Sequence, residues 1–217
     1  MEAAPAGPAA ELPVGSAAGP LTVVPTPDDG TRRSVQQPWD ETTRPVGPAP
    51  DRDRTFTADQ QAAGQHLVDI HDHLRGELEQ LRDLIEQVAA GTLDPGAARS
   101  MVNAMTLRQN NWTLGVYCTS YCRMVTGHHT LEDRSVFPHL RRSDARLAPV
   151  IDRLEEEHHV IAGVIDEVDR ALVALVTEPD GVAAVRAAVD LLTDTMRSHL
   201  SYEERELVEP LARLGYY

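Results

Sequence analysis

Apolar residues in this chain recur at spacings of three and four over long stretches, and no stretch of useful length alternates with a period of two. Such spacing places apolar side chains on one face of an α-helix, whereas a half-buried strand needs alternation. Four stretches of this kind are joined by short links. The pattern therefore predicts an all-α fold, with four main helices arranged as an up-down four-helix bundle.

Residue types typical of helix ends mark the borders of these stretches. Thr57 and Gln60 form a capping-box pattern at the start of the first helix, and Gly91 ends it. Pro95 takes the first helical position of the second stretch. The predicted helices cover residues 58–90, about 95–140 with a break near 110–111, about 143–176, and about 182–214.

Proline is concentrated near the N-terminus, where ten of the 15 prolines lie in the first 50 residues. A segment of this composition buries too little apolar surface to offset the entropy lost on ordering. We therefore predict a disordered tail over residues 1–54, dispensable for folding and metal binding, and one bundle domain over residues 55–217. The alternative is a tail that binds a protein partner, with Trp39 as its only large anchor.

The charge balance narrows the possible partners. The chain has 34 acidic and 20 basic residues, and its net charge of −14 argues against the basic face that nucleic acid or an anionic membrane surface requires. No apolar run approaches the ~18 residues of a membrane span, and the N-terminus carries no apolar signal segment. Cys118 and Cys122 lie four apart on one predicted helix, where a disulfide would strain the backbone. We therefore expect free thiols and a cytoplasmic protein.

Histidine and glutamate recur at matching places in the four predicted helices. Two helices carry a His and a Glu four residues apart, and this spacing puts both side chains on one face. The other two carry a His followed by apolar residues at the same offsets of three, seven, ten and fourteen. An imidazole and a carboxylate on a rigid helix suit a metal ion. The predicted metal ligands are His71, His128, Glu132, His158, His199 and Glu203.

Each of these features alone has a common non-functional explanation. A lone inward His is usually a hydrogen-bonded core residue, and a lone His-x-x-x-Glu is usually an exposed polar pair. Their coincidence on four helices argues for a metal, because burying these groups together without one would leave costly unpaired polar atoms. Six ligands are too many for one tetrahedral zinc ion. Two carboxylates can bridge two ions, and imidazole with carboxylate suits iron, so we predict two non-haem iron ions.

The first histidine doublet leaves the register open. His128 with Glu132 is preferred because this pair mirrors the pair on the fourth helix, and His129 with Asp133 is the rival. In the preferred register, Asp133 would orient a ligand from outside. In the second doublet, the apolar offsets favour the first histidine over His159.

The four motifs together resemble the hemerythrin-like (HHE cation-binding) domain, of the bacterial non-haem di-iron type, over residues 58–214. The resemblance implies a four-helix bundle whose two iron ions are bridged by an oxo, hydroxo or carboxylate ligand. Members of the family bind oxygen, sense oxygen or iron, or handle nitric oxide and peroxide. The segments that carry the resemblance are His71-x-x-Leu74-Arg75, His128-x-x-x-Glu132-Asp133, Glu157-His158-x-x-Ile161 and His199-x-x-x-Glu203-Glu204.

The resemblance also exposes a difference. Oxygen carriers of the family use a fifth His one turn after the third-helix His, and Ala162 stands there. We therefore expect one iron to lack an imidazole. Tyr121 and Tyr117 lie seven and eleven residues before His128, within ~20° of its direction on a helix. We predict that they act at the metal pair, as a phenolate ligand or as a hydrogen-bond donor to a bound oxidant. The alternative is core packing.

These observations predict a di-iron protein that reacts with hydrogen peroxide, nitric oxide or both, and so handles oxidative or nitrosative stress. The absent fifth His disfavours oxygen storage. The alternative function is a sensor or binding module for oxygen, nitric oxide or iron, without turnover. Small-molecule oxidants are the expected partners in both cases.

Overall fold

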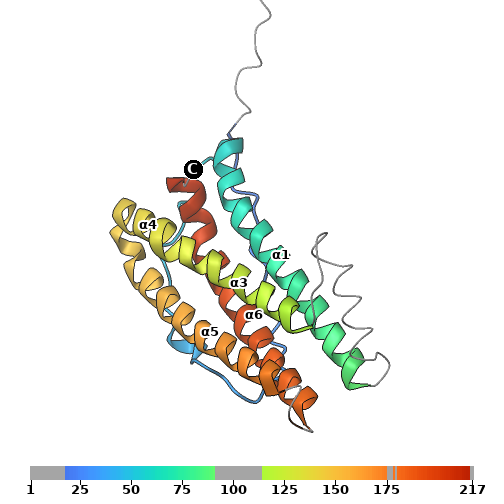
Figure 1. The fold of residues 1–217 in the computed structure, drawn as a ribbon. Coiled ribbons are helices and arrows are strands. Elements are labelled where there is room, and N and C mark those ends of the chain that lie inside the picture. Colours follow the sequence, from blue (N-terminus) through green and yellow to red (C-terminus); the bar gives the residue numbers. More distant parts are fainter. Residues whose placement is uncertain (1–17, 91–113, 175–177, 179, 216–217) are drawn as a thin grey trace, which may run out of the picture.

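The computed structural model describes residues 18–90, 114–174, 178 and 180–215 of the chain. Its long helices run alternately up and down beside one another (Figure 1): α1 (Ala58–Ala89), α3 (Leu114–Leu131), α5 (Ala148–Ala174) and α6 (Gly181–Leu214). Beyond α3 the chain continues through a π-helical turn, Glu132–Val136, into the short helix α4, Phe137–Ser143. Within the described residues there is no strand beyond an isolated bridge. The predicted all-α four-helix bundle is confirmed.

The helix borders follow the capping residues. Thr57 Oγ1 accepts the N–H of Gln60 at 3.3 Å, and the Gln60 side chain accepts the N–H of Thr57 at 3.0 Å. The predicted capping box is therefore present. Asp144 accepts the N–H of Arg146 and caps a 3-10 turn that leads into α5. The predicted helix start at Pro95 and the break near residues 110–111 lie outside the described residues.

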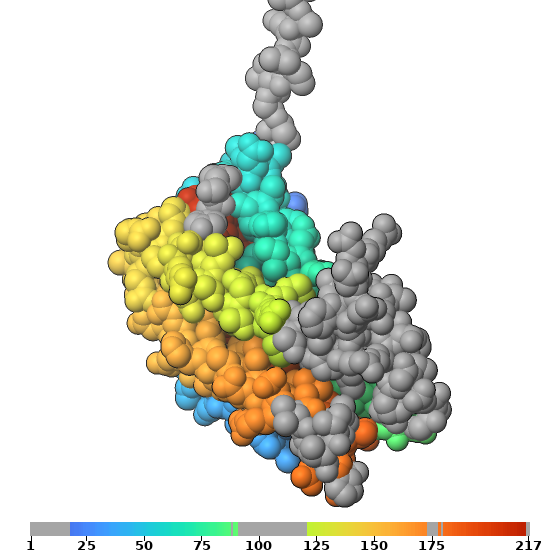
Figure 2. Space-filling model, in the orientation of Figure 1, coloured from blue at the N-terminus to red at the C-terminus, as the bar shows by residue number. Residues whose placement is uncertain are grey.

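Two apolar clusters fill the bundle, one on each side of a polar layer. Leu74, Leu81 and Met196 belong to the first cluster, and Phe137 and Leu207 belong to the second. Figure 2 shows α3 and α4 covering the space between α1 and α5 on one face. Where the two clusters meet, the inward positions of the helices change from apolar to ionisable. The buried side chains of this layer include His71, Glu132, His158, His199 and Glu203.

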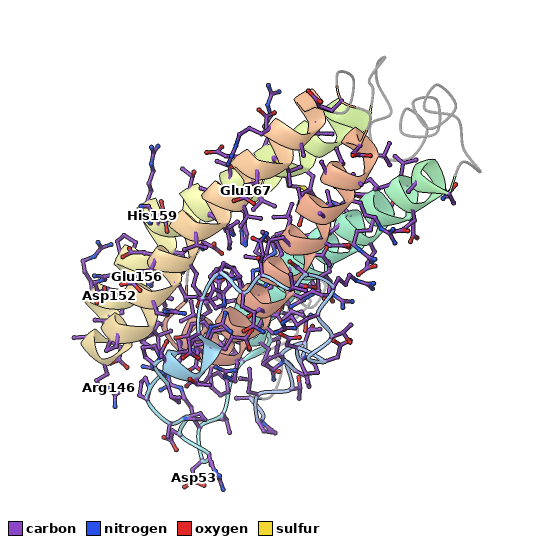
Figure 3. The ribbon with its side chains drawn as sticks, turned by 90° about the horizontal axis from the view of Figure 1, so that it is seen from below. Asp53, Arg146, Asp152, Glu156, His159 and Glu167 are labelled. Carbon is purple, nitrogen blue, oxygen red and sulfur yellow. The ribbon has the colours of Figure 1, made fainter. Side chains whose placement is uncertain are left out.

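Residues 18–54, here called the strap, lie along the outside of the helices, and Figure 3 shows this segment crossing in front of α6. An antiparallel bridge joins Gly19 to Phe56, with N–H···O distances of 3.1 and 2.7 Å. Val23 is buried in the second apolar cluster, and Trp39 packs against the first. The strap is thus an ordered layer of the fold.

The prediction of a disordered tail is therefore wrong for the strap, and residues 1–17 lie outside the described residues. The physical reason is that polar contacts, more than apolar burial, hold this proline-rich segment. The buried carboxylate of Asp194 on α6, for example, accepts the N–H groups of Arg33 and Ser34 at 2.6 and 2.7 Å. Prolines cost the strap little here, because they pre-set an extended backbone.

No helix among the described residues is long and apolar enough to cross a membrane. Among the described side chains Cys122 is a free thiol, and its burial raises the pKa to about 11. The side chain of Cys118 lies outside the described residues.

Candidate metal centre

Buried ionisable side chains from all four long helical segments meet in the polar layer. They form two groups, and within each group the potential ligand atoms lie within 4.8 Å of one another. Group A contains His71, His128, Glu132 and Glu203, and group B contains His129, His158 and His199. The structure thus brings together all six predicted ligands and adds a seventh residue, His129.

The two glutamates connect the groups. Glu132 Oε1 lies 3.1 Å from His128 Nε2, and Glu132 Oε2 lies 3.6 Å from His158 Nε2. Glu203 Oε2 lies 3.5 Å from His71 Nε2 and 3.7 Å from His199 Nε2. Each carboxylate therefore faces one histidine of each group, and this position would allow it to bridge two ions.

His128 and His129, predicted as alternatives, both face the centre, whereas Asp133, the acid of the rival register, belongs to neither group. His128 belongs to group A, whereas the ring of His129 stacks on that of His158 with a centroid distance of 3.9 Å. A π-helical turn begins three residues after His129, at Glu132. It is defined by the hydrogen bond from the N–H of Phe137 to the carbonyl of Glu132, five residues earlier. Such turns widen a helix locally and are frequent at functional sites.

His129 brings a further imidazole to group B. The expectation that one iron lacks an imidazole rests on Ala162, one turn after His158 on α5, and the extra imidazole reaches group B from α3 instead. The sequence carries a signal for this residue in the His128–His129 doublet. As a choice between two ligands, the doublet predicts one inward histidine, whereas the structure turns both inward, one toward each group.

In the second doublet, the preferred histidine is the one in the centre. His158 is buried in group B, while His159 is exposed and points away from the bundle beside Glu156 (Figure 3). The Nδ1 atom of His159 lies 2.7 Å from the carbonyl oxygen of Glu155, one turn earlier on its own helix.

Carboxylates outside the two groups hold three of the histidines. Nδ1 of His71 lies 2.9 Å from Glu204 Oε1, and Nδ1 of His199 lies 3.1 Å from Glu157 Oε2. In the same way, Asp133 Oδ1 lies 2.7 Å from Nδ1 of His158 in group B. A carboxylate at Nδ1 favours the tautomer that keeps its proton there, so Nε2 is left as the ligand atom facing the centre.

Burial sets the charge of the centre. It lowers the pKa of His128 to about 2 and that of His199 to about 4, and it lowers the pKa of His129 well below the usual range. These imidazoles are therefore neutral near pH 7, which is the form that binds a metal. Burial also raises the pKa of Glu203 to about 8 and that of Glu132 well above its usual range.

Three imidazole nitrogens that face the centre are buried and make no hydrogen bond: Nε2 of His129, His158 and His199. A buried polar atom without a partner costs ~1–3 kcal/mol, so three in one group need an explanation. A metal ion in group B would satisfy all three, and a set of imidazoles and carboxylates, as in groups A and B, fits iron. The residues present therefore suit the predicted metal pair.

The two predicted tyrosines lie on α3. Tyr121 is buried in the first apolar cluster, with Leu74 and Val125 among its members. Tyr117 lies one turn earlier on α3, and its side chain is outside the described residues. With His129 in group B, neither tyrosine is needed to replace a missing imidazole.

A cavity of about 170 Å³ reaches group B from the surface between α3 and α5. His129 and His158 form part of its wall, together with Asp133 and the hydroxyl-bearing Thr130. Ala162, an exposed residue, lines the same cavity. The small side chain at this position thus leaves an opening beside two candidate ligands.

Comparison with known families agrees with this geometry. The family model described as hemerythrin HHE cation binding domain matches residues 63–211. The match spans most of the chain and includes every residue of groups A and B. No curated protein and no solved structure matches the chain. The chain belongs to the hemerythrin HHE cation-binding domain family.

Proposed function

We propose that this protein holds two non-haem iron ions and reacts with hydrogen peroxide, nitric oxide or both. The observation that carries the proposal is the position of Glu132 and Glu203, each within 3.7 Å of histidine nitrogens from both groups. Two carboxylates placed in this way serve two ions better than one. The ions would supply Lewis-acid and redox chemistry, with an oxo, hydroxo or carboxylate bridge between them.

The surrounding residues support this chemistry by fixing the ligand atoms. Glu204, Glu157 and Asp133 each hold a histidine through Nδ1, so three Nε2 atoms keep a defined direction without an ion to organise them. Such outer contacts are worth ~10–100-fold in metal affinity or activity. A centre organised in advance can bind and release small oxidants with little rearrangement.

The cavity beside group B has room for small reactants. A water molecule occupies ~30 Å³ in the liquid, so a space of about 170 Å³ admits a few molecules of that size. Hydrogen peroxide, nitric oxide and oxygen fit this limit. We propose that they enter past Thr126 and Ala162 and meet the His129 side of the centre. The free thiol of Cys122 agrees with a reducing cytoplasm as the place of this activity.

We further propose that Tyr121 assists the reaction as a hydrogen-bond donor, with Tyr117 as the weaker candidate. Tyr121 lies on the same helix as His128, two turns before it, and is buried. A phenol in that place is suited to donate a hydrogen bond or a proton toward a bound oxidant, directly or through water. Direct ligation is the smaller part of this proposal, because His129 already supplies the extra imidazole.

A sensor or binding module without turnover is the second candidate function. It is favoured by the contacts between the strap and the acids that hold His71 and His199, because these contacts connect the centre to the protein surface. In this case oxygen, nitric oxide or iron would bind at the same groups and alter how the strap lies.

Steady-state assays of the iron-loaded protein test the proposal, with hydrogen peroxide alone, where turnover is disproportionation to water and oxygen, and with nitric oxide added as the electron donor that is oxidised to nitrite. We expect consumption over many turnovers, lost in His129→Ala and kept in the control variant His73→Ala, which removes an exposed histidine on α1 away from the cavity. Binding of nitric oxide or oxygen with no turnover would favour the sensor. An iron-loaded protein that neither binds nor consumes these molecules would contradict both candidates.

A further inference from the structure

The two carboxylates that hold His71 and His199 each have a second partner in the strap. Arg44 donates from Nε and Nη2 to the two oxygens of Glu157, at 2.8 and 2.9 Å. The backbone N–H of Thr26 donates to Glu204 Oε2 at 2.6 Å. The strap is therefore connected to one histidine of each group. In each case one carboxylate lies between the strap and the histidine.

These contacts are deeply buried. Glu157 and Glu204 have side chains that are 1% and 0% exposed, and the side chain of Arg44 is 7% exposed. Arg153 on α5 adds a hydrogen bond to Glu157 Oε1 at 2.8 Å. Three guanidinium N–H groups thus reach the two oxygens of Glu157, two from Arg44 and one from Arg153. A carboxylate buried this deeply needs such cationic partners, and Arg44 is the one that contacts both of its oxygens.

The position of Arg44 is fixed on its own side as well. It ends a short 3-10 turn that Asp40 caps, and its guanidinium lies 5.4 Å from the ring centroid of Trp39 and 4.7 Å from that of Tyr202. The next carbonyl along the chain, that of Pro45, accepts the hydroxyl of Tyr202 at 2.9 Å. The planar guanidinium suits this place, because it packs on two aromatic rings and donates two hydrogen bonds to one carboxylate. A lysine could not make the same pair of hydrogen bonds.

We propose that Arg44 is a positioning residue of the metal centre, and that the strap belongs to the centre. Arg44 fixes the direction of Glu157, and Glu157 accepts the Nδ1–H of His199. The Nε2 atom of His199 is thereby kept free to face the other two histidines of group B. Thr26 acts in the same sense on Glu204 and His71. The inference rests on the proposed metal-binding function and assigns the strap a part in it.

The tautomer of His199 tests this inference without any metal. In the full-length, metal-free chain near pH 7.5, nitrogen NMR of labelled histidine distinguishes an Nδ1–H ring from an Nε2–H ring. We expect a single Nδ1–H form in the native chain and a mixture in Arg44→Met. Asp194→Ala is the matched control, because Asp194 anchors the strap through Arg33 and Ser34 and no contact of Glu157 involves it. It should keep the native tautomer.

Metal release provides the second readout. The chain is loaded with Zn²⁺ and mixed with an excess of a chelating dye, and we expect release ~10–100-fold faster in Arg44→Met than in the native chain. Arg44→Lys should fall between the two, and it replaces Arg44→Met if that variant fails to fold. Asp194→Ala should release Zn²⁺ within about threefold of the native rate.

Two results would overturn the proposal. One is a native tautomer together with a native release rate in the Arg44 variants. The other is an equal effect of Asp194→Ala, which would mean that docking of the strap matters and Arg44 does not. A native chain that binds no Zn²⁺ would count against the proposed function, whereas the tautomer comparison would still decide the role of Arg44.

Discussion

His128 and His129 are consecutive residues, yet their imidazoles belong to different halves of one centre. Nε2 of His128 lies 3.1 Å from Nε2 of His71, while the ring of His129 stacks on that of His158. The two rings are tilted by 41° to each other, with centroids 5.6 Å apart. One turn of α3 therefore faces both proposed metal positions.

This relationship predicts a selective loss of metal in His129→Ala. The change removes one of three imidazoles from group B and leaves group A complete, so the iron content should fall from about two ions per chain to about one. His159→Ala is the control, because His159 is exposed and belongs to neither group, so this variant should retain both ions. Elemental analysis distinguishes the outcomes, and an unchanged content in His129→Ala would remove this residue from the ligand set.

A second prediction ranks two neighbouring acids. Glu132→Ala removes a carboxylate that faces both groups, so at least one ion should be lost. Asp133→Ala removes only the partner of His158 Nδ1, and the metal affinity should fall by ~10–100-fold with both ions still bound at saturation. Chelator competition measures both effects. The opposite ranking would place Asp133, and not Glu132, between the ions.

Much of this centre was predictable from sequence because helical periodicity is regular. The spacing of His71 and His158 to the apolar positions after them was enough to place both residues inside. The His129 position was not predictable in the same way. Whether a second histidine turns inward depends on the crossing of α3 with α5 and on the π-helical turn after it, and neither is encoded in a local spacing.

The strap shows a different limit. Its composition predicts disorder when only apolar burial is counted. In the structure, buried carboxylates on α5 and α6 accept hydrogen bonds from the side chain of Arg44 and from backbone N–H groups such as those of Thr26 and Gly47. The acids that receive them, such as Glu157 and Asp194, have no apolar spacing that would single them out. Long-range polar pairing of this kind needs the tertiary fold to be known.

The raised pKa of Glu203 predicts how the stability of the metal-free protein depends on pH. The folded chain keeps this proton up to about pH 8, whereas an unfolded chain releases it near pH ~4.3. The unfolded state therefore binds fewer protons between these values, and the free energy of unfolding falls as pH rises. Glu203→Gln removes this dependence.

The test compares melting temperatures of Glu203→Gln and the native chain in the presence of a chelator. The difference, variant minus native, should be more positive at pH 8 than at pH 5. The lowered pKa of His199 has the opposite effect, since it reduces the free energy of unfolding as pH falls from ~6.5 toward 4. This effect is present in both proteins and cancels in the difference. A difference that is the same at both pH values would contradict the assigned pKa of Glu203.

Tyr121→Phe tests the proposed role of the buried phenol. Iron content should stay near that of the native chain, since the ring remains in the apolar cluster, and the reaction with peroxide or nitric oxide should slow. If the phenol binds iron directly, the oxidised native protein also has a visible charge-transfer band that the variant loses. An unchanged spectrum together with unchanged rates would make Tyr121 a packing residue, and Tyr117→Phe would be examined next.

The most direct test of the central claim is the metal content of the full-length chain after expression with sufficient iron. Five imidazoles and two connecting carboxylates in one buried layer predict close to two iron ions per chain by elemental analysis. A content near zero, or a single stoichiometric zinc ion with no iron, would contradict the di-iron account.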